Sequence, residues 1–176
     1  MDDIAPSPWV RRFAVLIRPG GRILDVACGF GRHARMLAGM GYVVEAVDHD
    51  AQALASLSGL PGVDARLADL ESERWPYGSG GFDAVVVTNY LFRPHFASLL
   101  ATLGPRGLLI YETFMAGNER LGRPSNPDFL LQPGELLERV RGHLSVVAFE
   151  QGRVEIPKPA FVQRICAVAA DLGALP

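Results

Sequence analysis

Short apolar segments alternate with amphipathic segments along most of the chain, and this alternation predicts alternating strands and helices. The segment Phe82–Thr88 contains the run Ala-Val-Val-Val, which is typical of a strand buried on both faces in a parallel sheet. Ser7 and Pro8 predict a helix over Pro8–Ile17, with a serine N-cap and proline in its first turn. The other expected strands are Arg22–Val26, Tyr42–Val47, Gly62–Leu67, Gly107–Thr113, Leu144–Glu150 and Phe161–Ala169. The other expected helices are Gly31–Met40, Ala51–Leu57, Pro94–Leu103 and Pro133–Arg141.

The order of these elements predicts how they pack. Strands and helices alternate until near the C-terminus, which favours a three-layer α/β sandwich around a Rossmann-like, mostly parallel, seven-stranded sheet. Gln151–Pro159 is too short to hold a crossover helix, so the last two strands should form an antiparallel hairpin at the sheet edge. A length of 176 residues suits one domain over residues 1–176, in which residues 1–20 supply an N-terminal helix that is a candidate cofactor lid.

A glycine turn follows the first predicted strand. Gly29 and Gly31 lie between that strand and a helix, and glycine lets the backbone approach a ligand where a Cβ would collide. The helix that starts at Gly31 directs unpaired N–H groups at a negative group. Asp48 lies about 20 residues beyond the turn, where an acid reaches the hydroxyl pair of a ribose. This pattern predicts half of a nucleotide-binding sheet.

The spacing of this motif allows two kinds of cofactor. Gly29-x-Gly31-x-x-Ala34 fits the relaxed dinucleotide fingerprint, in which alanine replaces the third glycine. Asp25, however, closes the first strand beside the turn, where its charge repels a pyrophosphate and suits the sulfonium and α-ammonium groups of S-adenosylmethionine. We therefore expect S-adenosylmethionine as cofactor and S-adenosylhomocysteine as product. An NAD-binding oxidoreductase-like domain and a non-catalytic S-adenosylmethionine-binding protein are the alternatives.

The composition of the chain limits the kinds of partner that it can be expected to bind. The net charge of −2 does not indicate binding to nucleic acid or to an anionic membrane surface. The longest apolar runs are strand-sized, and the first residues lack the basic start and apolar stretch of a signal peptide. Two cysteines far apart suggest no disulfide framework. We expect a cytoplasmic monomer or homodimer that acts on a small-molecule acceptor.

Several motifs together resemble the class I S-adenosylmethionine-dependent methyltransferases. The first is Leu24–Arg32; Asp48, Asp69-Leu70 and Asn89-Tyr90 then follow successive strands, and the terminal hairpin completes the pattern. Within that superfamily the chain is similar to small bacterial enzymes of the tellurite-resistance type, and the resemblance covers nearly its whole length. It implies transfer of a methyl group to a small molecule by in-line displacement. Ala27 departs from the pattern, because many members have glycine there.

The resemblance also implies cofactor contacts at single positions. It assigns the methionine part to Asp25 and the turn, the ribose to Asp48, and the adenine to Asp69. Arg12, on the first predicted helix, is a further candidate because a guanidinium can pair with the cofactor carboxylate. The expected cofactor contacts are Arg12, Asp25, Ala27, Gly29, Gly31, Asp48, His49, Asp69, Leu70, Asn89 and Tyr90.

Residues after the fourth and fifth strands are candidates for the acceptor side. Phe114–Pro127 is long and aperiodic, and such a segment in a compact domain is often functional. Its arginines could hold an anionic acceptor. The expected acceptor contacts are Tyr111, Glu112, Asn118, Arg120 and Arg123, and the catalytic candidates are Tyr90, His95 and Glu112. The four histidines show no metal-ligand spacing, so no metal is expected.

Overall fold

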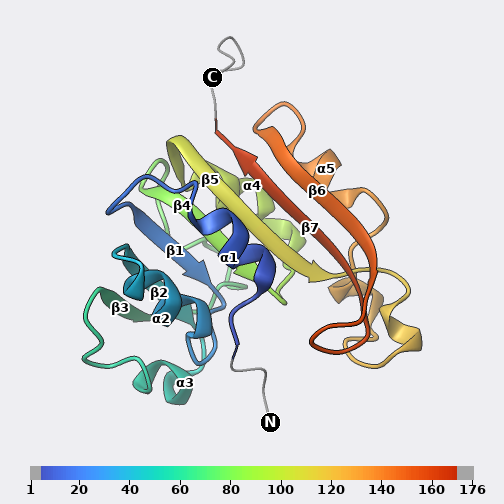
Figure 1. Ribbon diagram of the computed structural model, residues 1–176, viewed down its shortest axis with the longest axis horizontal. Coiled ribbons are helices and arrows are strands. Elements are labelled where there is room, and N and C mark those ends of the chain that lie inside the picture. Colours follow the sequence, from blue (N-terminus) through green and yellow to red (C-terminus); the bar gives the residue numbers. More distant parts are fainter. Residues whose placement is uncertain (1–4, 170–176) are drawn as a thin grey trace.

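A seven-stranded sheet runs through the middle of the structure, a computed structural model that describes residues 5–169 (Figure 1). The strand order is β3-β2-β1-β4-β5-β7-β6. The strands are β1 (Arg22–Val26), β2 (Val43–Asp48), β3 (Val63–Leu67), β4 (Phe82–Thr88), β5 (Leu103–Phe114), β6 (Ser145–Val154) and β7 (Ala160–Val168). The helices are α1 (Pro8–Ala14), α2 (Arg32–Gly39), α3 (Ala51–Ala55), α4 (Phe96–Ala101) and α5 (Glu135–Val140), with short 3-10 turns at Arg93–His95, Asn118–Arg120 and Pro127–Phe129.

The pairing of the strands confirms the expected fold class. Strands β1 to β5 pair in parallel, whereas β7 lies antiparallel between β5 and β6. Strand β1 pairs with β2 on one side and with β4 on the other, so the order of the chain reverses at β1. In an open α/β sheet, ligands bind outside the carboxyl ends of the strands at such a reversal. The topology therefore predicts a ligand site at the carboxyl ends of β1, β2 and β4.

Two apolar clusters hold the helices on opposite faces of the sheet. Trp9 and Phe13 of α1 and Leu37 of α2 belong to one cluster, together with Leu54 of α3. Phe96 of α4 and Leu136 of α5 belong to the other. Figure 1 shows α1 in front of the sheet, and α4 is drawn fainter behind it. The expected three layers are thus confirmed, and burial of apolar area on both faces is the main stabilising contribution.

Some boundaries differ from those expected. Helix α1 ends at Ala14 rather than near Ile17, and residues 1–4 of the expected N-terminal helix lie outside the described part of the chain. The helix expected over Pro94–Leu103 is α4 alone, preceded by a 3-10 turn. Leu103 instead opens β5, because it pairs with Phe82 across an irregular stretch of the ladder that periodicity does not reveal.

The turn after β1 has an unusual backbone. Ala27, Gly29 and Gly31 all have left-handed φ angles, of 52°, 54° and 71° respectively. Such angles strain a residue that carries a Cβ, and they favour glycine. Gly31 also forms the N-cap of α2 without a side-chain hydrogen bond, and a Cβ there would lie 2.7 Å from Leu57 Cδ1. Nothing would lie within 4 Å of a Cβ at Gly29.

We expect Gly31→Ala to lower the free energy of unfolding by about 2–4 kcal/mol, because backbone strain adds to overpacking against the buried Leu57. Gly29→Ala is the matched control, and it should cost only about 1–2 kcal/mol because strain alone acts there. Urea unfolding of the two variants measures the difference. Equal losses would show that Leu57 moves aside without cost.

Candidate functional site

Asp48 connects the end of β2 to the glycine turn. Its Oδ2 accepts a hydrogen bond from the Gly29 N–H at 2.8 Å, and its Oδ1 accepts one from the Asp50 N–H at 3.0 Å. The carboxyl group is buried, and His49 Nδ1 lies 3.5 Å from Oδ1. Because a carboxylate oxygen has two lone pairs, each oxygen retains capacity for another donor. Asp48 therefore fixes the turn and can still bind a ligand.

A cavity of about 420 Å³ opens at this edge of the sheet. Its lining contains three carboxylates and no lysine or arginine, so it suits a ligand that carries positive charge or hydroxyl donors. Six of the lining residues were expected cofactor contacts, and the sequence analysis missed Glu71. The lining residues are Ala27, Asp48, His49, Asp69, Leu70, Glu71 and Tyr90.

Tyr90 brings a phenol to this cavity from the segment after β4. Its hydroxyl is buried and has no hydrogen-bond partner among the described residues. Burial, and then the carboxylates of Glu71, Asp69 and Asp48, raise the pKa of Tyr90 above its usual value, so the hydroxyl keeps its proton. The phenol is therefore available to donate a hydrogen bond into the cavity.

Asp25 lies beneath the turn rather than in the lining of the cavity. It is 1% exposed, its Oδ2 has no partner among the described residues, and the Ala34 N–H of α2 hydrogen-bonds to the carboxyl group. Burial raises the pKa of Asp25 to about 7, although the Ala34 N–H and the Arg32 charge act in the opposite direction. Any effect on a ligand thus comes from the charge of Asp25 acting through the turn.

Gly29 and Gly31 of the turn are not in the cavity lining, and neither are the expected residues Arg12, His95 and Asn89. Arg12 lies 3.7 Å from Glu150 and over the Phe13 ring. His95 Nε2 donates to the Ser72 carbonyl at 2.7 Å. Asn89 has a left-handed φ of 54° and an exposed side chain. Asn89 follows β4 directly and is next to Tyr90 in the sequence.

The residues expected to bind an acceptor have different surroundings. Tyr111 is buried, and its hydroxyl donates to the Tyr90 carbonyl at 2.7 Å. Asn118 is also buried; its amide group donates to the Pro124 carbonyl and accepts from the Phe161 N–H. These two residues shape the segment after β5. Arg120 and Arg123 are exposed on that segment.

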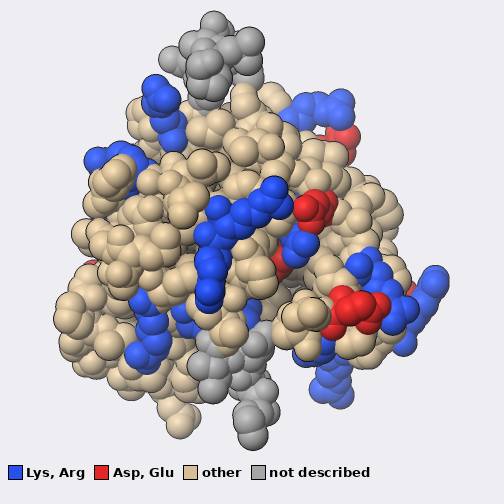
Figure 2. All heavy atoms as spheres, in the orientation of Figure 1, with Lys and Arg blue, Asp and Glu red and all other residues tan. Residues whose placement is uncertain are grey.

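A partly buried network of hydrogen bonds that the sequence analysis missed surrounds Glu112. Ser7 donates from its hydroxyl to Glu112 Oε1 at 2.7 Å and from its N–H to His33 Nε2 at 3.0 Å. Arg164 donates to Glu112 Oε2 at 3.1 Å and also pairs with Glu150. Basic side chains and acidic groups are interspersed on this face (Figure 2). His33 follows Gly31 of the glycine turn by two residues, and this position was the only feature of the sequence that could have indicated these contacts.

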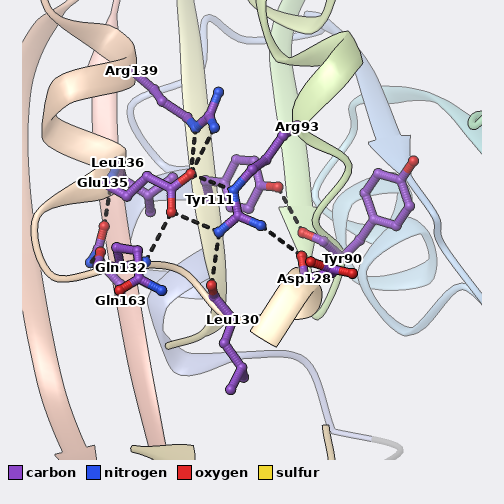
Figure 3. A network of polar contacts seen from close by, with 10 residues as sticks. All are labelled: Tyr90, Arg93, Tyr111, Asp128, Leu130, Gln132, Glu135, Leu136, Arg139 and Gln163. Carbon is purple, nitrogen blue, oxygen red and sulfur yellow. Dashed lines mark hydrogen bonds and ion pairs between the residues drawn. The ribbon is translucent and has the colours of Figure 1, made fainter. Parts of the chain in front are cut away.

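A second polar network holds the segment that carries Tyr90 (Figure 3). Arg93 donates two hydrogen bonds to Glu135, both at 2.8 Å, and two more to the carbonyls of Asp128 and Leu130. Burial opposes ionisation of Glu135, but hydrogen bonds from Arg93, the Gln132 N–H and Arg139 outweigh it and lower the pKa of Glu135 to about 2. The network therefore links the segment after β4 to the start of α5.

Among residues 5–169, no group of three or more His, Cys, Asp or Glu side chains could hold a metal ion. No helix in the same range is long and apolar enough to cross a bilayer.

A family model described as a methyltransferase domain matches residues 23–105. This stretch begins in β1, ends in β5 and includes every residue that lines the cavity. Among curated proteins, none matches the sequence significantly.

Three solved structures show the same fold. TehB from Haemophilus influenzae has a TM-score of 0.78 and 18% identity over 93% of this chain, which spans 62% of the TehB chain. A SAM-dependent methyltransferase from Methanosarcina mazei has a TM-score of 0.72 and 16% identity, with 94% of this chain and 99% of that one covered. The 1,6-didemethyltoxoflavin-N1-methyltransferase from Burkholderia thailandensis, solved with 1,6-didemethyltoxoflavin and S-adenosylhomocysteine, has a TM-score of 0.67, 18% identity and coverages of 93% and 79%.

The Arg93–Glu135 network leads to a prediction on stability. Glu135→Gln should lower the free energy of unfolding at pH 7 by about 2–3 kcal/mol, because two arginines lose a counter-charge that is only 12% exposed. Glu138→Gln is the matched control. Its partner Arg141 and Glu138 itself are 74% and 65% exposed, so the change should stay within about 0.5 kcal/mol.

The same pair of variants gives the pH dependence. A lowered pKa means that the folded protein holds Glu135 ionised, so this stabilisation is complete above the usual pKa of 4.5 and is lost as the pH falls toward 2. Denaturant unfolding between pH 2 and pH 7 measures it. A deficit in Glu135→Gln that does not shrink with acid would contradict the assignment.

Proposed function

We propose that this chain is a class I S-adenosylmethionine-dependent methyltransferase and that it transfers a methyl group from S-adenosylmethionine to a small-molecule acceptor. The observation that carries the proposal is the acidic cavity at the carboxyl ends of β1 and β2, which has no cationic side chain in its lining. The acceptor is inferred by analogy with the Burkholderia enzyme, which was solved with a small molecule bound.

The residues around the cavity fit this cofactor. Asp48 has spare acceptor capacity for the ribose hydroxyls, and Asp69 lies after β3, where it can accept from the adenine amino group. Leu70 is buried and offers an apolar surface to the adenine ring. The unpartnered Tyr90 hydroxyl and the negative charge beneath the turn suit a polar, positively charged ligand. We assign Ala27, Gly29, Gly31 and His49 to the same contact surface.

Methyl transfer from a sulfonium requires that the reacting groups be aligned more than it requires proton transfer. The cofactor supplies a methyl group on a sulfonium, which is already an activated leaving group. The protein then has to orient the acceptor, the methyl and the sulfur in line and to keep water out. We propose that Tyr90, held by the Tyr111 hydroxyl through its carbonyl, forms the wall beside the sulfur. His95 remains a candidate for proton transfer only with an acceptor that must lose a proton.

We place the acceptor against the segment that follows β5. Arg120 and Arg123 are its exposed cations, and the contact of Arg120 with Glu119, at 3.9 Å, is itself exposed. Asn118 anchors the segment through Pro124 and Phe161. The Arg93 and Arg164 guanidiniums are already paired with carboxylates. An anionic acceptor would therefore be bound by Arg120 and Arg123, while Asn89 offers an exposed amide beside the donor.

Titration with S-adenosylhomocysteine tests the donor site. The wild type should bind it, and Asp48→Asn should weaken binding by about tenfold or more. Asparagine replaces one of the two acceptor oxygens with an NH2 donor, so it cannot accept from the Gly29 N–H, the Asp50 N–H and two ribose hydroxyls together. Asp50→Asn is the matched control: asparagine caps α3 as well as aspartate does, so affinity should change less than about twofold. Wild type that binds NAD and no adenosyl thioether would overturn the proposal.

The pKa of Asp25 predicts a pH dependence. A cationic ligand favours the ionised form of Asp25, so affinity for S-adenosylhomocysteine, which retains the α-ammonium, should rise as the pH increases from 6 to 8 through the pKa of about 7. The comparison is made between His49→Gln and His49→Gln/Asp25→Asn, so that the imidazole of the cavity lining is absent from both variants. The double variant should show a flat profile. Parallel profiles would exclude Asp25 as the group responsible.

A further inference from the structure

The segment Ala5–Ser7 is held at the cofactor end of the sheet by side chains that the cavity does not use. The Ser7 N–H donates to His33 Nε2, and the Ser7 hydroxyl donates to Glu112 Oε1. Arg32 donates to the Ala5 carbonyl at 3.2 Å. In Figure 1 the chain that enters α1 passes the carboxyl ends of the central strands.

His33 is suited to this contact because both ring nitrogens are engaged. The ring is 1% exposed, and Nδ1 lies 3.4 Å from Thr88 Oγ1 at the end of β4. Since Nε2 accepts from Ser7, the proton of the neutral ring lies on Nδ1 and points to Thr88. Burial and the Arg32 charge lower the pKa of His33 to about 3, so the ring stays neutral at pH 7. A protonated ring could not accept from Ser7.

The position of this segment relative to the cavity is defined by the strand register. Glu112 pairs with Thr88 across β5 and β4, and its carbonyl accepts from the Asn89 N–H. The polar cavity residues, apart from Tyr90, come instead from the ends of β2 and β3. Ser7 bonds to His33 in the first turn of α2 and to Glu112 of β5. It therefore lies on the other side of the N-terminal end of α2 from the cavity residues of β2 and β3, where a nucleoside would bind. If the nucleoside of an adenosyl ligand fills the cavity, the side of the turn nearer Ser7 is left for its amino-acid end.

We propose that His33 and Glu112 are positioning residues that hold Ala5–Ser7 as a wall on the amino-acid side of the donor site. The inference rests on the proposed function, because it takes the donor to be an adenosyl thioether. It gives Glu112 a role through Ser7 that does not require contact with the acceptor. Arg164, paired with both Glu112 and Glu150, keeps that carboxylate in place.

A matched pair of His33 variants tests the wall. Glutamine places its amide oxygen near the position of Nε2 and can still accept from Ser7, whereas asparagine reaches only to the position of Nδ1. The probes are S-adenosylhomocysteine and 5′-methylthioadenosine, which lacks the amino-acid end, and calorimetry gives both affinities. We expect His33→Asn to bind S-adenosylhomocysteine about tenfold more weakly and 5′-methylthioadenosine within about twofold of wild type, and His33→Gln to retain both affinities.

The outcomes separate this inference from the proposed function. Wild type that binds neither probe contradicts the proposed function. Wild type that binds both, with His33→Asn weakened equally for both probes or for neither, overturns the wall while leaving the donor site intact. Thermal unfolding checks that the variants fold. If both His33 variants unfold, Glu112→Gln, which keeps an acceptor oxygen for Ser7, and Glu112→Met, which has none, provide the same comparison with the same expected results.

Discussion

The hydrogen bond from the Gly29 N–H to the buried Asp48 carboxylate is the contact on which the cavity depends. It joins the turn after β1 to the end of β2 and holds three left-handed residues in one arrangement. The second oxygen of Asp48 binds the Asp50 N–H, and the Asp50 side chain then caps α3. One carboxylate therefore fixes the turn, the following loop and the start of a helix. Strain at Ala27 is tolerated because these contacts determine the backbone around it.

The distribution of charge explains how a widely used fold becomes selective. Arginines near the carboxyl edge are engaged by carboxylates: Arg93 by Glu135, and Arg164 by Glu112 and Glu150. The carboxylates that line the cavity have no arginine or lysine beside them in the lining. The site is left with a negative potential that favours a cationic ligand. A fold shared at 16–18% identity would not by itself specify this preference.

Much of the architecture follows from local sequence patterns. The apolar run of β4, the glycine turn and the cap at Ser7 depend on neighbours in sequence, and the structure confirms them. The start of β5 at Leu103 was not predictable, because it depends on pairing with Phe82 through an irregular ladder. Helix α1 also ends early, at a position that local propensity does not mark.

For the site, the sequence by itself determined which residues follow the parallel strands, and hence that Asp48, Asp69 and Tyr90 meet at one edge. The reason is geometric: parallel strands bring their carboxyl ends together whatever the connections between them. Only the tertiary structure decided the partners of polar groups far apart in the chain. Ser7 bonds to Glu112 across 105 positions, and Arg93 bonds to Glu135 across 42. These contacts have no local period, because a buried polar group is satisfied by whichever partner the packing brings near.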